Sequence, residues 1–205
     1  MDVTALIDAV SRTKSQADEL THQEVIDQLS AALAKFTTSA ENQRFAEEYR
    51  PSGNYTRLLL NSLQDPYQIV LVFWGPGKGS PIHDHDDTTG VVSALTGATK
   101  EIKYAVTRHV GACVELAEAS EFTIAPGRIT PILPEDDKRL HLMVNEGTCW
   151  AATVHVYLTA IDRYRQYEAT PGGAFRTAET RLWFDEWGVG RRMPTGAVRA
   201  RSRKG

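Results

Sequence analysis

Short apolar runs, separated by turn residues at intervals of about ten positions, occupy the chain from Tyr55 to Leu158. The runs are rich in β-branched and aromatic residues, and most are too short for a helix. Glycine and proline mark many of the breaks, for example Gly75 to Gly77 and Pro126 to Gly127. Regular breaks of this kind are typical of an antiparallel sandwich or barrel. We therefore predict strands over residues 56–60, 67–74, 90–95, 100–106, 112–116, 121–124, 129–133, 139–145 and 149–158.

The first fifty residues carry a helical period instead. Their apolar residues recur three or four positions apart, which is the spacing of one face of a helix. Thr21, followed three positions later by Glu24, also matches a capping box at a helix start. We predict two or three helices, with apolar positions at Leu6, Val10, Val25, Ile26, Leu29, Leu33 and Phe36.

The length and composition predict one compact domain with smaller parts at its ends. The 205 residues, of which 41% are hydrophobic, suffice for a sizeable core. Aromatic residues within 161–167 and 181–187 have near-helical spacing, and we expect them to pack across the barrel exterior. The predicted parts are a helical appendage at 1–50, a barrel at 51–168, a C-terminal segment packing on the barrel at 169–190, and a basic disordered tail at 191–205.

Charge and cysteine content restrict the function classes. A net charge of −3 gives no basic field for nucleic acid, and no apolar stretch approaches the length of about 18 to 20 residues that spans a bilayer. No export signal is evident at the N-terminus, and we predict that Cys113 and Cys149 are buried thiols. We expect a cytoplasmic monomer. Its tail is interpreted as solubilising, with a weak acidic partner as the alternative, and carries Arg191, Arg192, Arg199, Arg201, Arg203 and Lys204.

The strongest chemical signal is the pair His83 and His85. Two histidines one residue apart on a strand project from the same face, and imidazole is a good ligand for divalent transition metals. His141 heads a later strand-like segment and could supply a third nitrogen. The sequence therefore predicts a mononuclear metal site. Asp84, between the two histidines, is expected to point to the opposite face of the strand.

These residues lie in a pattern that resembles the cupin superfamily. The first cupin motif is matched by Gly77, His83, His85 and Gly97, and the second by Pro126, Gly127, His141 and Asn145. The glutamate of the first motif falls at Gly90, so no carboxylate is offered there as a fourth ligand. Three neutral imidazoles would leave the charge of a ferrous ion uncompensated and three positions open, which favours an anionic, chelating substrate.

Further residues resemble the cysteine dioxygenase family of thiol dioxygenases, over about residues 50–165. Tyr55 and Arg57 match the family's Tyr-x-Arg, and Thr153, His155 and Tyr157 match its Ser-x-His-x-Tyr. The resemblance implies an Fe(II) cofactor and a substrate carboxylate bound by the arginine. It also implies a catalytic tyrosine whose position is fixed through the histidine and the hydroxyl residue.

Elementary chemistry agrees with these roles. The planar fork of Arg57 can hold a carboxylate by two hydrogen bonds. Thr153, His155 and Tyr157 alternate along one strand, so they share a face and can form a hydrogen-bonded relay. Gly90 replaces the cysteine that cross-links to the tyrosine in animal members, and this difference leaves the choice between L-cysteine and 3-mercaptopropionate open.

Our hypothesis from the sequence is a thiol dioxygenase that converts L-cysteine, or a related thiol carboxylate, to a sulfinic acid with O2. Its predicted metal ligands are His83, His85 and His141. Its predicted substrate-binding residues are Arg57 and Tyr55, and its predicted catalytic residues are Tyr157, His155 and Thr153.

Two alternatives remain for the function. One is a cupin oxygenase of specialised metabolism acting on a cysteine-derived substrate, and the other is a non-catalytic cupin that binds a small ligand. For single residues, Arg57 could pair with an acid such as Glu48, and His155 could be an ordinary core histidine. His109 is expected to be exposed and without a role.

Overall fold

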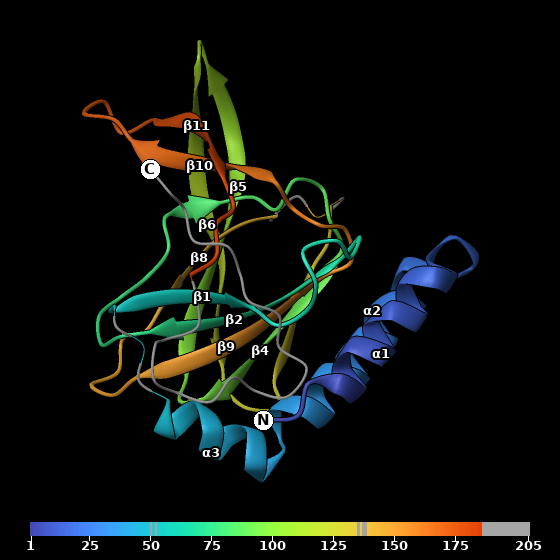
Figure 1. The fold of residues 1–205 in the computed structure, drawn as a ribbon. Helices are drawn as coiled ribbons and strands as arrows, with labels where there is room; N and C mark the ends of the chain where they lie inside the picture. Colours follow the sequence, from blue (N-terminus) through green and yellow to red (C-terminus); the bar gives the residue numbers. More distant parts are fainter. Residues whose placement is uncertain (50, 52, 135, 137–138, 186–205) are drawn as a thin grey trace.

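The computed structural model describes all residues except 50, 52, 135, 137–138 and 186–205, so the predicted tail lies outside the described part. Helices α1 (Thr4–Gln16), α2 (His22–Thr37) and α3 (Ala40–Glu48) come first, with a 3-10 turn, η1 (Ala17–Glu19), after α1. The remaining elements are strands (Figure 1). They are β1 (Tyr55–Leu59), β2 (Gln68–Trp74), β3 (Ile82–His83), β4 (Gly90–Thr96), β5 (Thr99–Val110), β6 (Cys113–Ile124), β7 (Ile129–Ile132), β8 (Leu140–Val144), β9 (Ala151–Tyr157), β10 (Arg163–Ala169) and β11 (Phe175–Arg181).

The strands form two antiparallel sheets. The first has the order β1-β2-β9-β4-β7, and the strands of the second, β10-β11-β6-β5-β8-β3, close into a barrel. The long hairpin of β5 and β6 projects from the body (Figure 1). The predicted mainly β, antiparallel barrel preceded by helices is confirmed. Among the described helices, none is both long and apolar enough to span a membrane.

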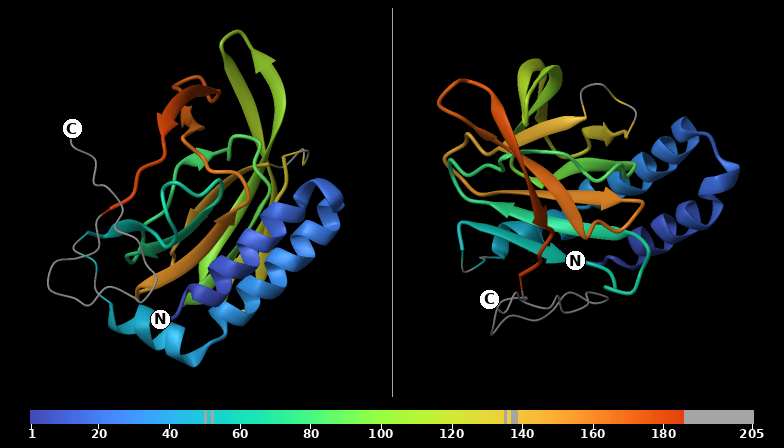
Figure 2. Two further views of the ribbon diagram at one scale, coloured as in Figure 1. Left: turned by 45° about the vertical axis from the view of Figure 1, so that its right-hand side comes forward. Right: turned by 90° about the horizontal axis from the view of Figure 1, so that it is seen from above.

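Helices α1 and α2 lie side by side against the outer face of the first sheet (Figure 2). Leu29, Leu33 and Phe36 of α2 are buried in one cluster with apolar residues of β4 and β9. The predicted capping box is present, since the Thr21 hydroxyl accepts from the Glu24 amide while the Glu24 carboxylate accepts from the Thr21 amide. The predicted N-terminal helices are thus confirmed, and so is the predicted capping box at the start of α2.

Both faces of the first sheet are covered, which explains why every residue of β2 and β9 is buried. In β2, Leu71 and Phe73 join the cluster under the helices, whereas Val72 and Trp74 belong to the interior cluster. The same alternation sends Val154 and Val156 of β9 toward the helices. The intervening positions of β9 therefore face the barrel interior, and they carry its polar residues.

Some predictions for the second sheet were wrong. Residues 163–169 and 175–181 form the hairpin of β10 and β11, which is part of the second sheet and not a layer on the barrel exterior. Trp187, the last aromatic residue of the predicted segment, lies outside the described residues. Tyr164 of β10 is buried in the interior cluster. His83 and His85 were expected on one strand, but β3 ends at His83 and His85 lies beyond it. The predicted strands 112–116 and 121–124 are one strand, β6. Cys113 is only half-buried and Cys149 is exposed, contrary to the prediction; both are free thiols.

Asn145 joins the end of β8 to the end of β2. Its buried amide nitrogen donates to the carbonyl oxygens of Trp74 (3.0 Å), Gly75 (3.3 Å) and Cys149 (2.8 Å). Its amide oxygen accepts from the Gly147 backbone at 3.0 Å. One side chain thus serves four backbone groups beside the strand that carries His141.

Replacing Asn145 by alanine should lower the free energy of unfolding by about 1–3 kcal/mol, because buried carbonyl groups lose their donors. Urea denaturation followed by circular dichroism measures the change. Asn54→Ala, at an exposed side chain, is the control and should stay within about 0.5 kcal/mol of wild type. Equal stabilities of the two variants would contradict the role given to Asn145.

Candidate metal and substrate site

Three histidines converge inside the barrel. His83 ends β3 and pairs directly with His141 of β8, while His85 follows two positions after His83. The rings lie 4.5–5.0 Å apart between centroids, and one nitrogen from each residue lies within 4.8 Å of the others. The structure therefore brings together the three residues that the sequence predicted as ligands.

Hydrogen bonding leaves the inward nitrogens of this cluster without partners. His83 Nδ1 lies 2.9 Å from the Pro81 carbonyl oxygen, so that nitrogen carries the proton and Nε2 is the basic one. Both ring nitrogens of His85 and Nε2 of His141 are buried with no hydrogen-bond partner. Burial, and next the neighbouring His141, hold the pKa of His83 and of His85 well below the ordinary value. Imidazoles that each present a nitrogen without a partner fit a divalent metal ion, which would satisfy all three.

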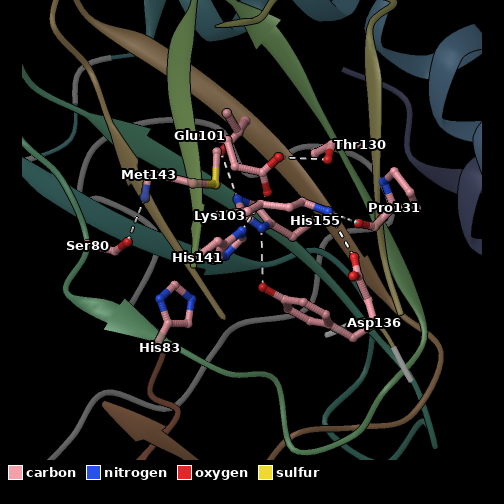
Figure 3. Close-up of polar contacts among 12 residues, drawn as sticks. Ser80, His83, Glu101, Lys103, Thr130, Pro131, Asp136, His141, Met143 and His155 are labelled. Atoms are coloured by element: carbon pink, nitrogen blue, oxygen red, sulfur yellow. Dashed lines mark hydrogen bonds and ion pairs between the residues drawn. The ribbon is translucent and has the colours of Figure 1, made fainter. Parts of the chain in front are cut away.

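Glu101 of β5 fixes the ring of His141 from behind (Figure 3). Its Oε1 lies 2.6 Å from His141 Nδ1, and its Oε2 accepts from the Thr130 hydroxyl at 2.7 Å. Burial is the largest single influence on the pKa of Glu101 and raises it, but the hydrogen bond and charge of His141, the Thr130 hydroxyl and Lys103 together outweigh burial, and the pKa of this carboxyl lies below its ordinary value. A carboxylate that accepts the Nδ1 proton directs the free Nε2 toward the metal position.

Glu101 was not predicted from the sequence, although a signal was present. Thr99 and Glu101 alternate at the start of β5, and both are buried. An acidic residue at an inward position of a strand is rare unless it has a partner. Lys103, two positions on, donates to the Pro131 carbonyl oxygen at 3.2 Å and lies 3.8 Å from Asp136 (Figure 3).

Gly90, where the cupin motif has a glutamate, leaves no space for a side chain. A Cβ at this position would lie 2.3 Å from the Val156 carbonyl oxygen and 3.4 Å from Cδ1 of Tyr157. The backbone of β9 approaches β4 too closely there for either a carboxylate or a cysteine. The carboxylate of this site is that of Glu101, which contacts Nδ1 of His141.

Arg57 lies across the same cavity from the histidines. Its side chain is buried, its Nε donates to the Tyr55 hydroxyl at 2.7 Å, and its Nη2 donates to the Tyr164 hydroxyl at 3.4 Å. The guanidinium carbon also lies 5.0 Å from the Tyr55 ring centroid and 5.3 Å from that of Trp183. Nη1 has no partner. The guanidinium is thus held by phenols rather than by Glu48, and one side of its fork is open.

Thr153, His155 and Tyr157 form a connected chain on β9. The Thr153 oxygen lies 2.8 Å from His155 Nε2, and His155 Nδ1 lies 3.2 Å from the Tyr157 oxygen. Burial, and next the neighbouring His141, lower the pKa of His155 to about 3, so this imidazole is neutral at ordinary pH. Burial also raises the pKa of Tyr157, which keeps its proton. The predicted relay is therefore present as a set of contacts, and His155 is a buried, hydrogen-bonded histidine within it.

Trp74 extends this chain and sets its direction. Its indole nitrogen donates to the Thr153 oxygen at 2.8 Å. An indole N–H can only donate, so the threonine keeps its own proton available for His155 Nε2. The neutral imidazole then carries its proton on Nδ1, toward the Tyr157 oxygen. When the Tyr157 oxygen accepts from His155 Nδ1, the Tyr157 hydroxyl can donate its own proton to a group in the cavity.

Other predicted positions lie outside the site chemistry. Asp84 turns away from the histidine cluster, and its carboxylate accepts from the Arg165 backbone (2.9 Å) and from Arg165 Nε (2.6 Å). This pair fastens the histidine segment to β10. His109 is exposed as predicted, although it lies within strand β5 rather than in a loop.

Comparison with known proteins places these residues in a family. The family model described as Cysteine dioxygenase type I matches residues 2–170, which include all three histidines, Arg57 and the β9 relay. The chain belongs to this family. Its architecture is mainly β and antiparallel, with helices leading the chain.

Individual relatives are distant. Cysteine dioxygenase type 1 of Rattus norvegicus is 28% identical over 151 residues, which cover 72% of each chain. The Homo sapiens protein of the same name is 27% identical over 156 residues, 76% of this chain and 74% of its own. Among solved structures, a cupin-superfamily sugar phosphate isomerase from Silicibacter pomeroyi has a TM-score of 0.43 at 18% identity, covering 68% of this chain and 81% of its own. An oxalate oxidase has a TM-score of 0.40 at 15% identity, covering 53% of each chain.

Glu101→Gln should weaken metal binding by about 10- to 100-fold, because the amide oxygen can still accept from His141 but the negative charge is lost. Competition with a chromogenic chelator for ferrous ion under argon measures the affinity. Glu118→Gln, at an exposed position that accepts from the Tyr104 hydroxyl, is the matched control. An unchanged affinity in Glu101→Gln would show that the carboxylate does not support the site.

Proposed function

We propose that this protein is a non-haem Fe(II) thiol dioxygenase. It oxidises L-cysteine, or a closely related thiol carboxylate such as 3-mercaptopropionate, with O2 to the sulfinic acid. The observation that carries the proposal is one cavity lined by His83 and His85, against which His141 packs, and by an arginine with an open donor. Such a cavity suits a molecule with a metal-binding group at one end and a carboxylate at the other.

The histidine cluster is the proposed iron site. His83, His85 and His141 would hold the ion, and Glu101 keeps His141 oriented. When bound, Fe(II) supplies the redox chemistry by which both atoms of O2 are added to the thiolate sulfur, so that R–S⁻ and O2 give R–SO2⁻. Among the described residues, no carboxylate or thiolate belongs to the cluster beside the three histidines.

Arg57 is the proposed receptor of the substrate carboxylate. It is the one cationic side chain among the described residues that line the cavity, since the histidines there are neutral. No described carboxylate hydrogen-bonds to the guanidinium itself, although the Asp185 carboxylate accepts from the Arg57 backbone N–H at 3.0 Å. An entering carboxylate would therefore be the direct ion-pair partner of the guanidinium. Tyr55 holds Arg57 in the orientation that exposes Nη1.

Tyr157 is the proposed catalytic residue beside the reacting sulfur. Its ring lies 5.6 Å from that of His85, which brings its hydroxyl to the metal end of the cavity. With its proton free to donate, it can stabilise negative charge as it develops on the substrate. Thr153 and His155, together with Trp74, hold this donor direction, and their burial shields it from water.

The apolar walls favour a small substrate. Val70, Val72, Met143, Ile161 and Leu182 line the cavity between the polar ends. They exclude water from the reacting group and leave the arginine as the place for one negative charge.

His83→Ala should remove iron and oxygen consumption together, because two imidazoles and open solvent do not replace a three-nitrogen site. Iron content by absorption spectrometry and oxygen uptake with L-cysteine measure the two effects. His109→Ala serves as the control, since this residue is exposed on β5. Iron retained at full stoichiometry in His83→Ala would contradict the ligand assignment.

A panel of thiols tests the substrate class. The ferrous-reconstituted protein should consume oxygen with L-cysteine or 3-mercaptopropionate at a kcat/KM at least about tenfold higher than with cysteamine, which lacks the carboxylate that Arg57 would bind. Mass spectrometry should find a sulfinic acid, with one O2 consumed for each thiol. Comparable turnover of cysteamine would remove the proposed role of Arg57, and a product other than the sulfinic acid would favour the alternative of a different cupin oxygenase.

A further inference from the structure

Tyr164 lies between the two ends of the proposed substrate site, and no role for it was predicted from the sequence. It belongs to β10, its side chain is buried, and it lines the same cavity as the histidines and Arg57. Its ring packs edge-on against the ring of His83 with 5.6 Å between centroids. Its hydroxyl lies 3.4 Å from Arg57 Nη2. A molecule that reaches from the histidine cluster to Arg57 would therefore pass beside this side chain.

The hydroxyl of Tyr164 accepts two hydrogen bonds and has a proton left over. One comes from Arg57 Nη2 and the other from the side-chain amide of Gln166, at 3.0 Å. A phenol oxygen also carries one proton that it can donate. Within the described part of the chain, no residue accepts that proton from Tyr164. A buried hydroxyl of this kind can donate a hydrogen bond to a molecule bound in the cavity.

Two further donors at this end of the cavity are open in the same way. Tyr55 accepts from Arg57 Nε at 2.7 Å, and no described residue accepts its proton. Arg57 Nη1 is buried and has no partner. The two phenols therefore flank one guanidinium, and three donor groups, the two phenol hydroxyls and Nη1, lack acceptors around Arg57. A carboxylate, with two oxygens and about four acceptor sites, suits three donors better than any neutral group does.

We propose that Tyr164 donates its hydroxyl proton to the substrate carboxylate and so determines the preference of the enzyme for thiol carboxylates. This inference rests on the proposed function and deepens it. Tyr164 supplies a donor that a guanidinium alone lacks, on the side that faces the metal cluster. It thereby sets the distance and direction between carboxylate and sulfur.

The charge balance of the pocket narrows the substrate class further. Arg57 contributes one positive charge, whereas Tyr55 and Tyr164 donate without adding charge. Asp84, the one acidic residue among the lining residues, is tied to Arg165 outside the cavity. Arg57 would therefore neutralise one carboxylate of a bound substrate, and no lining residue would neutralise a second. This favours a thiol monocarboxylate over a dicarboxylate such as mercaptosuccinate.

The test uses two pairs of thiols that differ in the carboxylate: L-cysteine with cysteamine, and 3-mercaptopropionate with 1-propanethiol. Calorimetric titration of the ferrous protein under argon gives the dissociation constant of each compound without turnover. Wild type should bind the carboxylate member of at least one pair more tightly. Tyr164→Phe should reduce that ratio by about 10- to 100-fold, because a hydrogen bond to a charged group is lost.

The matched control is Tyr167→Phe. Tyr167 is a half-buried tyrosine on the same strand and does not line the cavity. In Tyr167→Phe, the ratio of the dissociation constants within each thiol pair should stay as in wild type. Circular dichroism and iron content verify that both variants are folded and loaded. An unchanged ratio in Tyr164→Phe would overturn the inference.

A second measurement separates direct donation from a role through Arg57. Tyr164→Phe also removes the acceptor for Arg57 Nη2, so the substitution is repeated in an Arg57→Lys background, where that contact does not exist. A further fall in the ratio supports direct donation by Tyr164. No further fall means that Tyr164 acts only by holding Arg57, and direct donation is then wrong.

The outcome is distinguishable from a failure of the proposed function. If wild type oxidises none of the four thiols but binds the carboxylate members in a Tyr164-dependent way, the dioxygenase proposal fails and the carboxylate site stands. If wild type oxidises thiol carboxylates and Tyr164→Phe changes neither the binding ratio nor the ratio of KM values, the dioxygenase proposal stands and the role of Tyr164 fails.

Discussion

The pairing of β3 with β8 is the constraint on which the site depends. It joins a strand of only two residues to the strand that carries His141, and the one pair of residues in register is His83 with His141. Two segments far apart in the sequence therefore present imidazoles to one point. β3 is held on its other side by β10, through Gln166 opposite His83, and Asp84 adds its bonds to Arg165 of the same strand. The ligand segment is thus fixed from both sides, whereas β3 alone is too short to define it.

Burial without pairing gives the cavity its chemistry. A buried polar group that lacks a partner costs free energy, so a folded protein keeps few of them. Apart from Thr99 Oγ1, the unpartnered buried side-chain atoms among the described residues belong to this site: nitrogens of His85 and His141 in the histidine cluster, and Nη1 of Arg57. The charge at the cluster is balanced indirectly by Glu101, and that of Arg57 awaits an anion. The site is organised to receive two partners of opposite character, a metal ion and a carboxylate.

Much of this arrangement could be predicted from the sequence, because the signals are local. His83 and His85 are two positions apart, Thr153 to Tyr157 alternate on one strand, and the capping box at Thr21 depends on residues three positions apart. The histidine pair was expected on one strand face, but β3 ends at His83 and His85 follows it. What could not be predicted depends on pairing between distant strands. The role of Glu101 follows from its contact with His141, and that of Trp74 from its hydrogen bond to Thr153. Neither contact is visible in the sequence. Tyr164 was misplaced because aromatic spacing near 3.6 is compatible with a twisted hairpin as well as with a helix.

X-ray absorption at the iron edge of the ferrous protein tests the central claim most directly, since it counts the imidazole rings around the metal. The account predicts three nitrogen ligands from protein, with the outer-shell scattering of three histidine rings and oxygen from water in the remaining positions. Scattering from two rings or fewer, or a carboxylate bound to the iron, would contradict it.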